Sequence, residues 1–276
     1  MAASGPSKSA SAQERREAQR EALRKQRQAE LKRQRTVRTI VIAVITVIVL
    51  AVVSVAGLFI YRSLQPEGPV TMPEGMEQDQ PYLELGAPAD SDAPVVQIHL
   101  DFMCPHCGTF EEINAADIST MVENEEATVQ VVPRRFMDSS SSSGDFSSRA
   151  ANALTAVYAD DPANTLAFQE LVFANQPAQG SAGPSDDELW AFAEEVGASE
   201  QVRTDIEDRT YQPWVRQVSD PYGEENGGGT PYVEIDGEAF GSDQWSQEGA
   251  LREAVLAAGG EAAPSDGGGA SDGGEG

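Results

Sequence analysis

A nearly uninterrupted run of apolar residues from Ile40 to Ile60 divides the chain into two parts that cannot fold by the same rules. About 20 apolar residues are the length that an α-helix needs to cross the hydrocarbon core of a bilayer. Residues 1–38 carry eleven Lys and Arg against four Asp and Glu, whereas the rest of the chain carries eight against 41. Because basic flanks stay on the cytoplasmic side, this asymmetry predicts a cytoplasmic tail over 1–38, a transmembrane helix over 39–61 and an exported remainder.

A cleaved signal peptide is the alternative interpretation of the same run. The apolar region of a signal peptide usually spans about 7–15 residues. Ser54-Val55-Ala56 is similar to a small-residue cleavage site, but the apolar run continues from Leu58 to Ile60. The sequence therefore favours a retained anchor. The basic tail is polar on all sides, which indicates a solvated helix, with attraction to anionic lipid headgroups as the alternative.

Composition narrows the classes of function. The net charge of −26 argues against nucleic acid as a partner, because phosphate backbones require a basic surface. The acidic exterior is compatible with solubility or high ionic strength as well as with a preference for basic substrates. Two cysteines are too few for a disulfide-stapled scaffold.

Two segments of biased composition flank the part of the chain that can form a core. Residues 62–92 are punctuated by prolines and show no apolar periodicity, which predicts an extracytoplasmic linker. Residues 259–276 are rich in Gly, Ser and Asp, which predicts a disordered acidic tail. The folded domain is therefore predicted over 93–258, a length that buries a core of its own.

Within this domain, short apolar runs alternate with segments of helical period. The order predicts an α/β core with a helical insertion over about 146–218. Residues 222–229 are polar and glycine-rich, which predicts a mobile loop. The other expected elements are, in order, a strand over Val95–Phe102, a helix over Thr109–Met121, a strand over Ala127–Phe136, a helix with a capping box at Ser185–Glu188, a hairpin turn at Asp236-Gly237 and a last helix capped by Ser246.

The motif Cys104-Pro105-His106-Cys107 stands where the first strand ends and the first helix begins. A Cys-x-x-Cys pair is compatible with half of a zinc site, a structural bridge or a redox pair. Zinc would need His99 and His106 as further ligands, and the chain can hardly fold His106 onto an ion held by both flanking cysteines. A bridge over so short a loop constrains the unfolded chain little. The redox pair is the favoured interpretation.

A redox role for this pair has a physical mechanism. Cys104 is expected near a helix N-terminus, where unpaired N–H groups and the helix dipole stabilise a thiolate. Pro105 suits the first turn, since its missing N–H is not needed there. His106 can place an imidazole near the Cys104 sulfur; a solvent-exposed spacer is the alternative. Each effect that stabilises the thiolate makes the disulfide a stronger oxidant.

Two motifs far apart in the chain together resemble one family. Phe102–Cys107, following an apolar strand, is similar to the active-site region of the DsbA family of thiol–disulfide oxidoreductases in the thioredoxin superfamily. Gly229-Thr230-Pro231, directly before Tyr232–Gly237, resembles the cis-proline loop and hairpin of that family. The stretch Phe168–Phe173, leading through Gln176-Pro177 to Asp187-Glu188-Leu189, is similar to its inserted helical domain. The resemblance covers about 93–258 and implies a thioredoxin-like fold with a helical insertion.

The resemblance also implies a role for each matching residue. Cys104 would be the exposed nucleophile that forms a mixed disulfide, and Cys107 the buried partner that resolves it. Pro231 would be cis and face the cysteines, and the backbone of Thr230 would pair with an extended substrate strand. No cofactor or metal is implied. Family members are exported, in agreement with the predicted topology.

One position departs from the family pattern. Members often carry an acidic residue six positions before the first cysteine, where it can accept a proton, and this chain has Ile98 there. Asp101 and His99 lie nearby in sequence. His99 is a possible substitute, although a plain packed histidine is the favoured interpretation.

The sequence as a whole predicts a membrane-anchored, extracytoplasmic thiol–disulfide oxidoreductase that donates disulfides to exported cysteine-containing proteins. By resemblance, a quinone-linked oxidase in the membrane would re-oxidise it. Two alternatives stay open. The first is a reductase or isomerase of the same fold, and the second is a non-catalytic thioredoxin-like adaptor whose acidic face recruits basic partners.

Overall fold

The computed structural model describes residues 20, 24–25, 27, 30, 32–33, 38–54, 57 and 68–259. The chain divides into two compact units, Met1–Glu67 and Gly68–Gly276. In the first unit, residues 38–54 are helical and their side chains are exposed.

No helix among the described residues is both long enough and apolar enough to cross a membrane. The predicted span 39–61 runs beyond the described residues, since 55–56 and 58–61 are outside them. Most of the predicted tail 1–38 and all of 260–276 also lie outside the described residues. The anchor and the two tails therefore stay predictions.

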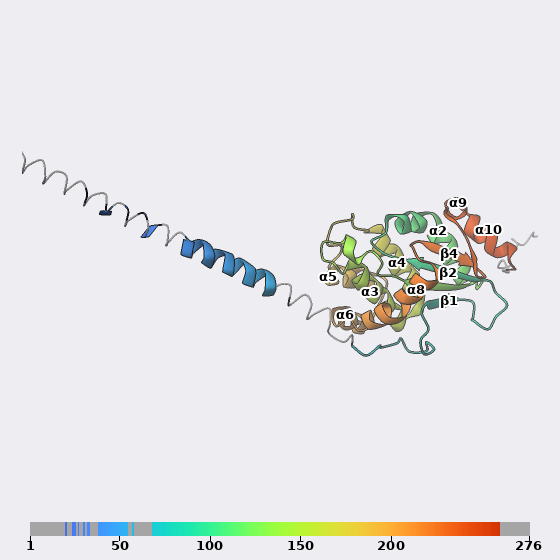
Figure 1. Ribbon diagram of the computed structural model, residues 1–276. Coiled ribbons are helices and arrows are strands. Elements are labelled where there is room, and N and C mark those ends of the chain that lie inside the picture. The colour runs from blue at the N-terminus through green and yellow to red at the C-terminus, as the bar shows by residue number, and fades with distance from the viewer. Residues whose placement is uncertain are drawn as a thin grey trace, which may run out of the picture. The chain divides into compact units, whose positions relative to one another are not determined.

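A five-stranded mixed sheet forms the centre of the second unit (Figure 1). Its strand order is β1-β3-β2-β4-β5, in which β2 and β3 are parallel and the other neighbouring pairs are antiparallel. Parallel neighbours need a crossover connection, and α2 supplies it here. The strands are β1 (Leu83–Gly86), β2 (Val95–Leu100), β3 (Thr128–Pro133), β4 (Tyr232–Ile235) and β5 (Glu238–Ala239).

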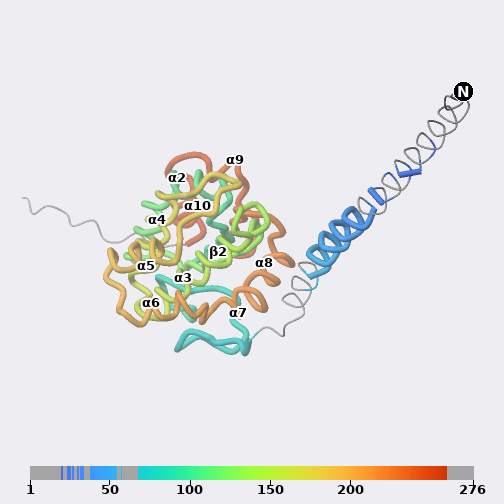
Figure 2. The backbone as a smooth tube through the Cα atoms, turned by 90° about the vertical axis from the view of Figure 1, so that its left-hand side faces the viewer, coloured from blue at the N-terminus to red at the C-terminus, as the bar shows by residue number. Residues whose placement is uncertain are grey.

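Apart from α2, which connects β2 to β3, the helices fall into two groups along the chain, one between β3 and β4 and one after β5. In two perpendicular views, α5 and α6 lie at one end of the domain and α9 at the other (Figures 1 and 2). The helices are α2 (Pro105–Glu123), α3 (Phe146–Asp160), α4 (Thr165–Ala174), α5 (Asp186–Glu195), α6 (Glu200–Glu207), α7 (Gln212–Trp214), α8 (Asp220–Asn226), α9 (Ser242–Trp245) and α10 (Ala250–Ala257), with short helical turns η1 (Asp138–Ser140), η2 (Pro162–Asn164) and a π-helical η3 (Val215–Ser219).

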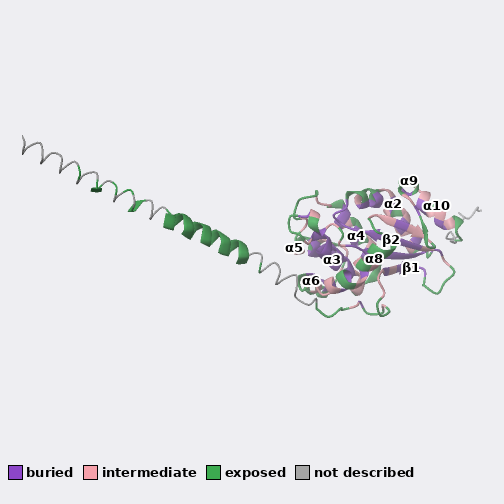
Figure 3. Cartoon of the chain, in the orientation of Figure 1, coloured by how far each residue is buried: buried purple, intermediate pink, exposed green. Residues whose placement is uncertain are grey.

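Helix α3 is the centre of the helical insertion. Every residue from Phe146 to Val157 is buried, and most of this helix is purple in Figure 3. It contacts α4, α5, α6 and α7, which surround it. A helix that is covered on all sides is expected to carry small and apolar residues on every face, and five alanines lie in α3. The predicted mixed α/β domain with a helical insertion is confirmed.

Two local predictions are confirmed in detail. The loop between β4 and β5 consists of Asp236 and Gly237, both with positive φ, as a tight hairpin turn requires. The α5 capping box is complete, because the Ser185 hydroxyl accepts from the Glu188 N–H and the Glu188 carboxylate accepts from the Ser185 N–H. Both features depend on neighbours within a few residues, which is why the sequence alone indicates them.

The predicted linker 62–92 is wrong for its second half, because it contains an edge strand of the sheet. Strand β1 pairs antiparallel with β3, and Leu83 and Leu85 are buried in the core. Just before this strand, the Trp214 indole N–H donates to the Gln80 carbonyl at 2.9 Å. The prolines around this strand are typical of a linker, and its partner strand lies more than 40 residues away in the sequence. Both facts explain why the sequence alone did not indicate it.

The predicted mobile loop 222–229 is wrong for residues 222–226, because they belong to helix α8 (Asp220–Asn226). Two of its glycines are required by close approach. A Cβ at Gly223 would lie 2.5 Å from Cδ of Arg134, and a Cβ at Gly227 would lie 2.6 Å from Nδ1 of His99. These glycines therefore let the segment pack against buried polar side chains.

The last helix begins later than predicted. Ser246 ends the short helix α9, and Gly249, with φ of 82°, precedes α10. Helix α9 has only four residues, too few to show a helical period in the sequence.

Candidate active site

The two cysteines lie at the N-terminus of α2, directly after β2. Cys104 is the N-cap residue and Pro105 occupies the first helical position. The backbone N–H groups of His106 and Cys107, in this first turn, lie close enough to the Cys104 sulfur to stabilise a thiolate. Cys104 is 5 % exposed and Cys107 is 1 % exposed. The expected exposed nucleophile is thus largely covered, because the loop that contains Thr230 lies over its sulfur.

The pKa values of the two thiols are displaced in opposite directions. Hydrogen bonding from the Cys107 side chain is the largest cause that lowers the pKa of Cys104 to about 5. Thr230 and the backbone N–H groups of Cys107 and His106 act in the same direction against burial. Burial raises the pKa of Cys107 well above its ordinary value. At neutral pH the pair therefore holds one thiolate on Cys104 and one thiol on Cys107.

The cis-proline loop faces this thiolate from the other half of the domain. The Thr230–Pro231 peptide bond is cis, as the resemblance implies. In its thiol form, Cys104 donates through Sγ to the Thr230 carbonyl at 3.3 Å across 126 positions of sequence. Strand β4 begins directly after this loop and pairs with β2, which carries the cysteines at its end. The pairing of β4 with β2 thus brings the two sequence motifs together.

His106 and Pro105 are exposed on the outer side of the first turn of α2. His106 affects the Cys104 sulfur through its backbone N–H, which helps to lower the pKa of Cys104. The expected contribution of its imidazole stays a prediction. Among the described residues, no group of three His, Cys, Asp or Glu is arranged to hold a metal ion.

A buried carboxylate lies beside Cys107, although Ile98 is apolar and fully buried. The Asp101 N–H donates to Cys107 Sγ at 3.5 Å, and the charge of Asp101 contributes to the raised pKa of Cys107. Burial raises the pKa of Asp101 itself to about 6. The sequence indicates Asp101 only by its closeness to the motif.

The Asp101 side chain ties the active site to the helical insertion. One carboxylate oxygen accepts from the Met103 N–H at 2.8 Å and from the Ser147 hydroxyl at 2.7 Å, and the other accepts from the Met137 N–H at 2.8 Å. His99 instead donates through its Nε2–H to the Gln97 Oε1 at 2.8 Å. Burial, followed by the nearby Arg134 charge, lowers the pKa of His99 to about 4, as expected for a packed neutral histidine.

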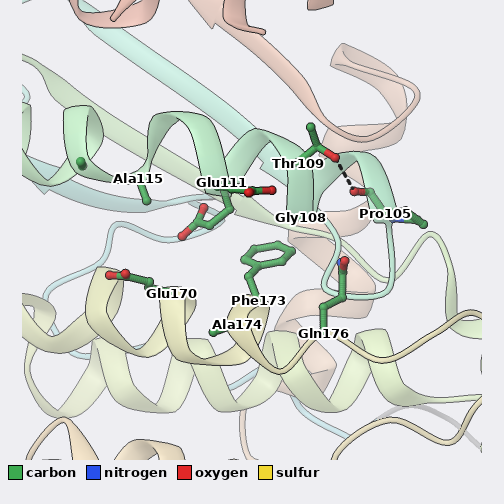
Figure 4. A pocket seen from close by; sticks show the side chains of 11 residues that line it. Pro105, Gly108, Thr109, Glu111, Ala115, Glu170, Phe173, Ala174 and Gln176 are labelled. Carbon is green, nitrogen blue, oxygen red and sulfur yellow. Dashed lines mark hydrogen bonds between the residues drawn. The ribbon is translucent and has the colours of Figure 1, made fainter. Parts of the chain in front are cut away.

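Gln176, which the sequence did not indicate as a site residue, holds the active-site turn from the side of the insertion. Its side-chain Nε2 donates to the carbonyls of Phe102 at 3.0 Å and Cys104 at 2.8 Å. The rings of Phe102 and Phe173 lie 4.8 Å apart between their centroids. A Cβ at Gly108 would lie too close to Oε1 of Gln176, so a larger residue there would displace the Gln176 side chain. Figure 4 shows Gln176 beside the turn that leads into α2.

A cysteine pair at a helix N-terminus, faced by a cis-proline loop on a mixed sheet, defines a thioredoxin-like redox site. Residues 87–254 match the family model described as Thioredoxin. This match covers more than half of the chain, and the chain belongs to the thioredoxin family.

Several solved structures match the fold of this chain over about two thirds of its length. The reduced disulfide bond oxidoreductase DsbG of Mycobacterium tuberculosis is 25 % identical with a TM-score of 0.56, covering 66 % of this chain and 90 % of its own. MdbA of Corynebacterium diphtheriae, a thiol-disulfide oxidoreductase, is 22 % identical with a TM-score of 0.54, covering 70 % and 96 %. BdbD of Bacillus subtilis is 19 % identical with a TM-score of 0.54, covering 69 % and 98 %, and like MdbA it shows the fold alone. The fold is that of the DsbA-like thiol–disulfide oxidoreductases.

A curated relative has a different overall organisation. The serine/threonine-protein kinase PknE of Mycobacterium tuberculosis is 30 % identical over 146 residues, which are 50 % of this chain. The chain spans 26 % of the length of that kinase. The similarity therefore concerns one part of that protein.

Proposed function

We propose that this protein is a membrane-anchored, extracytoplasmic thiol–disulfide oxidoreductase that donates disulfides to exported cysteine-containing proteins. The observation that carries the proposal is the contrast between Cys104, with its pKa lowered to about 5, and Cys107, with its raised pKa. A stabilised thiolate favours the reduced form of the pair, so its disulfide is a strong oxidant. The apolar run over 39–61, flanked by the basic tail, supports the anchor and its orientation.

The transfer takes two thiol–disulfide exchanges. A substrate thiolate attacks Sγ of Cys104 in the Cys104–Cys107 disulfide, a substrate–Cys104 bond forms, and Cys107 leaves and takes up a proton. The second substrate thiolate attacks the substrate sulfur of this mixed disulfide, and Cys104 leaves as a thiolate. The substrate loses two electrons and gains a disulfide, while the enzyme pair becomes reduced. The low pKa of Cys104 makes it a good leaving group in the second exchange.

The two electrons must leave the enzyme before the next cycle. We infer that a quinone-linked oxidase in the membrane accepts them, and an anchor over 39–61 would keep the domain near such a partner. The Thr230 backbone beside Cys104 is the position where an extended substrate strand would pair.

The reduction potential of the full-length protein, equilibrated against glutathione buffers with thiol trapping, tests the direction of transfer. A potential of about −120 to −180 mV is expected for a disulfide donor. A potential near about −270 mV would instead identify a reductant supplied from the cytoplasm. A Cys104→Ser variant that kept full cellular function would favour the non-catalytic adaptor.

Replacement of Cys107 tests the source of the low Cys104 pKa. In Cys107→Ala the largest cause of the lowering is lost, so the pKa of Cys104 should rise from about 5 toward its ordinary value. Thiolate absorbance at 240 nm followed against pH measures this change. The companion Cys107→Ser should accumulate mixed disulfides with substrates on non-reducing gels, whereas Cys104→Ser should accumulate none.

A further inference from the structure

A groove of about 590 Å³ begins beside the redox pair and runs between α2 and α4. Pro105 and Gly108, in the first turn of α2, form the end nearest the cysteines. Glu170, Phe173 and Gln176, from α4 and the turn after it, line the side opposite α2 (Figure 4). A polypeptide that delivers a thiol to Cys104 would thus have this groove within reach.

The groove combines apolar surface with three carboxylates. Glu112 and Glu170 are exposed at its sides, whereas Glu111 is only 4 % exposed. Burial raises the pKa of Glu111 to about 7, and the negative charge of Glu170 acts in the same direction. The eleven residues that line the groove include no Lys, Arg or His. Its negative charge is therefore not balanced from within the groove lining.

A buried acceptor beside the groove has no donor. The Gln169 side chain is 1 % exposed and donates through Nε2 to a Glu111 carboxylate oxygen at 2.9 Å. Its Oε1 has no hydrogen-bond partner among the described residues. Gln169 lines a smaller hollow, and Glu111, Ala115 and Glu170 line both this hollow and the groove. This hollow is too small to admit a water molecule, so Gln169 serves to hold the Glu111 carboxyl group at the wall of the groove.

The chemistry of these groups identifies the ligand. The exposed carboxylates of Glu112 and Glu170 are acceptors only, so the matching group has donors only and carries positive charge. Among side chains, only the Lys ammonium and the Arg guanidinium have this character at neutral pH. The apolar surface of Phe173 and Ala174 suits the methylene stem that carries such a group.

We propose that this groove is a substrate subsite that binds a Lys or Arg side chain of a cysteine-bearing polypeptide while its thiol reacts at Cys104. The inference rests on the proposed function and names the class of substrate for that same site. The acidic exterior attracts basic polypeptides in general, and the groove would bind one of their basic side chains at a defined position beside Cys104.

The experiment compares three reduced peptides that differ only at one position near a pair of cysteines, with Lys, norleucine or Glu there. The measured quantity is the rate constant for peptide oxidation by the oxidised full-length protein. The Lys peptide should react about fivefold faster than the norleucine peptide, as one or two partly exposed charge pairs would provide. In Glu112→Gln/Glu170→Gln this ratio should fall toward one.

A matched control separates the groove from the net charge of the protein. Glu194 and Glu195 are exposed on α5 and do not line the groove, so Glu194→Gln/Glu195→Gln removes the same charge elsewhere. This control should keep the wild-type ratio of Lys to norleucine rates. Equal rates for the two peptides in the wild type, or an equal loss of preference in the control, would overturn the groove proposal alone. Failure to oxidise any of the peptides would overturn the proposed function itself.

Discussion

The two faces of strand β2 meet different kinds of core. Val96, Ile98 and Leu100 point to one face and belong to the main apolar cluster. Gln97 and His99 point to the opposite face, which is just as buried but polar. One face is held by close packing of interchangeable apolar groups, whereas the other depends on specific hydrogen bonds.

The polar face forms a connected network that extends from the sheet edge to α8. Gln97 donates to Gln130 at 2.9 Å, and Gln130 donates to Glu84 on β1 at 3.2 Å. The Tyr222 hydroxyl on α8 donates to Gln97 at 3.2 Å. Asp101 follows on the same alternation, where β2 ends, and its carboxylate joins the active-site turn to α3. The comparison teaches that the apolar face supplies stability, and the polar face fixes how the insertion meets the redox site.

The largest loss of unfolding free energy is expected from substitution of Asp101, which lies where the polar face of β2 ends beside the cysteines. Asp101→Ala would leave the Met103 N–H, the Met137 N–H and the Ser147 hydroxyl without their acceptor. Loss of about 3–5 kcal/mol of unfolding free energy is expected from buried donors left unpaired. Urea denaturation of the full-length protein measures this loss.

Two further variants sharpen that measurement. Ser147→Ala removes only one donor and should cost about 1 kcal/mol. Asp101→Asn keeps the shape and one acceptor oxygen, so its cost should lie between the other two. A loss below about 1 kcal/mol in Asp101→Ala would contradict the view that the polar face depends on this carboxylate.

His99 should give the polar face a pH dependence that the apolar face lacks. Its pKa is lowered to about 4 in the folded protein against an ordinary 6.5, so the unfolded chain binds the proton more tightly. Stability should therefore fall as the pH decreases from 6.5 to 4, by up to about 3 kcal/mol. The comparison is with His99→Phe, which keeps an aromatic ring beside Tyr232 and removes the titration.

The difference in stability between wild type and His99→Phe isolates this effect. Burial raises the pKa of Asp101 to about 6 and that of Glu111 to about 7, and these acids act with the opposite sign. They bind protons more tightly in the folded state, so their contribution is lost as the pH rises through those values. Both acids are present in the wild type and in His99→Phe, so their contributions cancel in the difference in unfolding free energy between the two proteins. A difference that stays constant between pH 4 and 6.5 would show that His99 does not titrate differently on folding.

The parts of the fold that the sequence predicts are those with local signals. The short apolar run Val95–Phe102, the capping box at Ser185 and the Asp236-Gly237 turn each depend on residues that are close in sequence. Strand β1 and helix α8 were missed because their stability depends on distant partners. Gly223 illustrates the difficulty, since glycine indicates flexibility in a sequence but here accommodates the Arg134 side chain.

The residues of the active site also separate into those that a local sequence motif indicates and those that only the fold brings together. Cys104, Cys107 and Pro231 are predictable because their motifs are short and specific. Gln176 has no such motif, and only the packing of α4 against α2 brings it to the active-site turn. Glu111 lies on α2 itself, four residues after Cys107, but no motif indicates that Gln169 of α4 binds it. The role of Asp101 was equally hidden, because its three donors come from the active-site turn, the segment after β3 and helix α3.

The smallest loss of unfolding free energy is expected from a conservative substitution on the apolar face of β2. Ile98→Val removes one buried methyl group and should lower the unfolding free energy by about 1 kcal/mol, with the same loss at every pH between 4 and 7. Urea denaturation at several pH values measures it, and the pKa of Cys104 should stay at about 5. A loss that varies with pH, or a displaced Cys104 pKa, would show that the two faces of β2 are coupled. Constant values would mean that packing on the apolar face and hydrogen bonding on the polar face contribute independently.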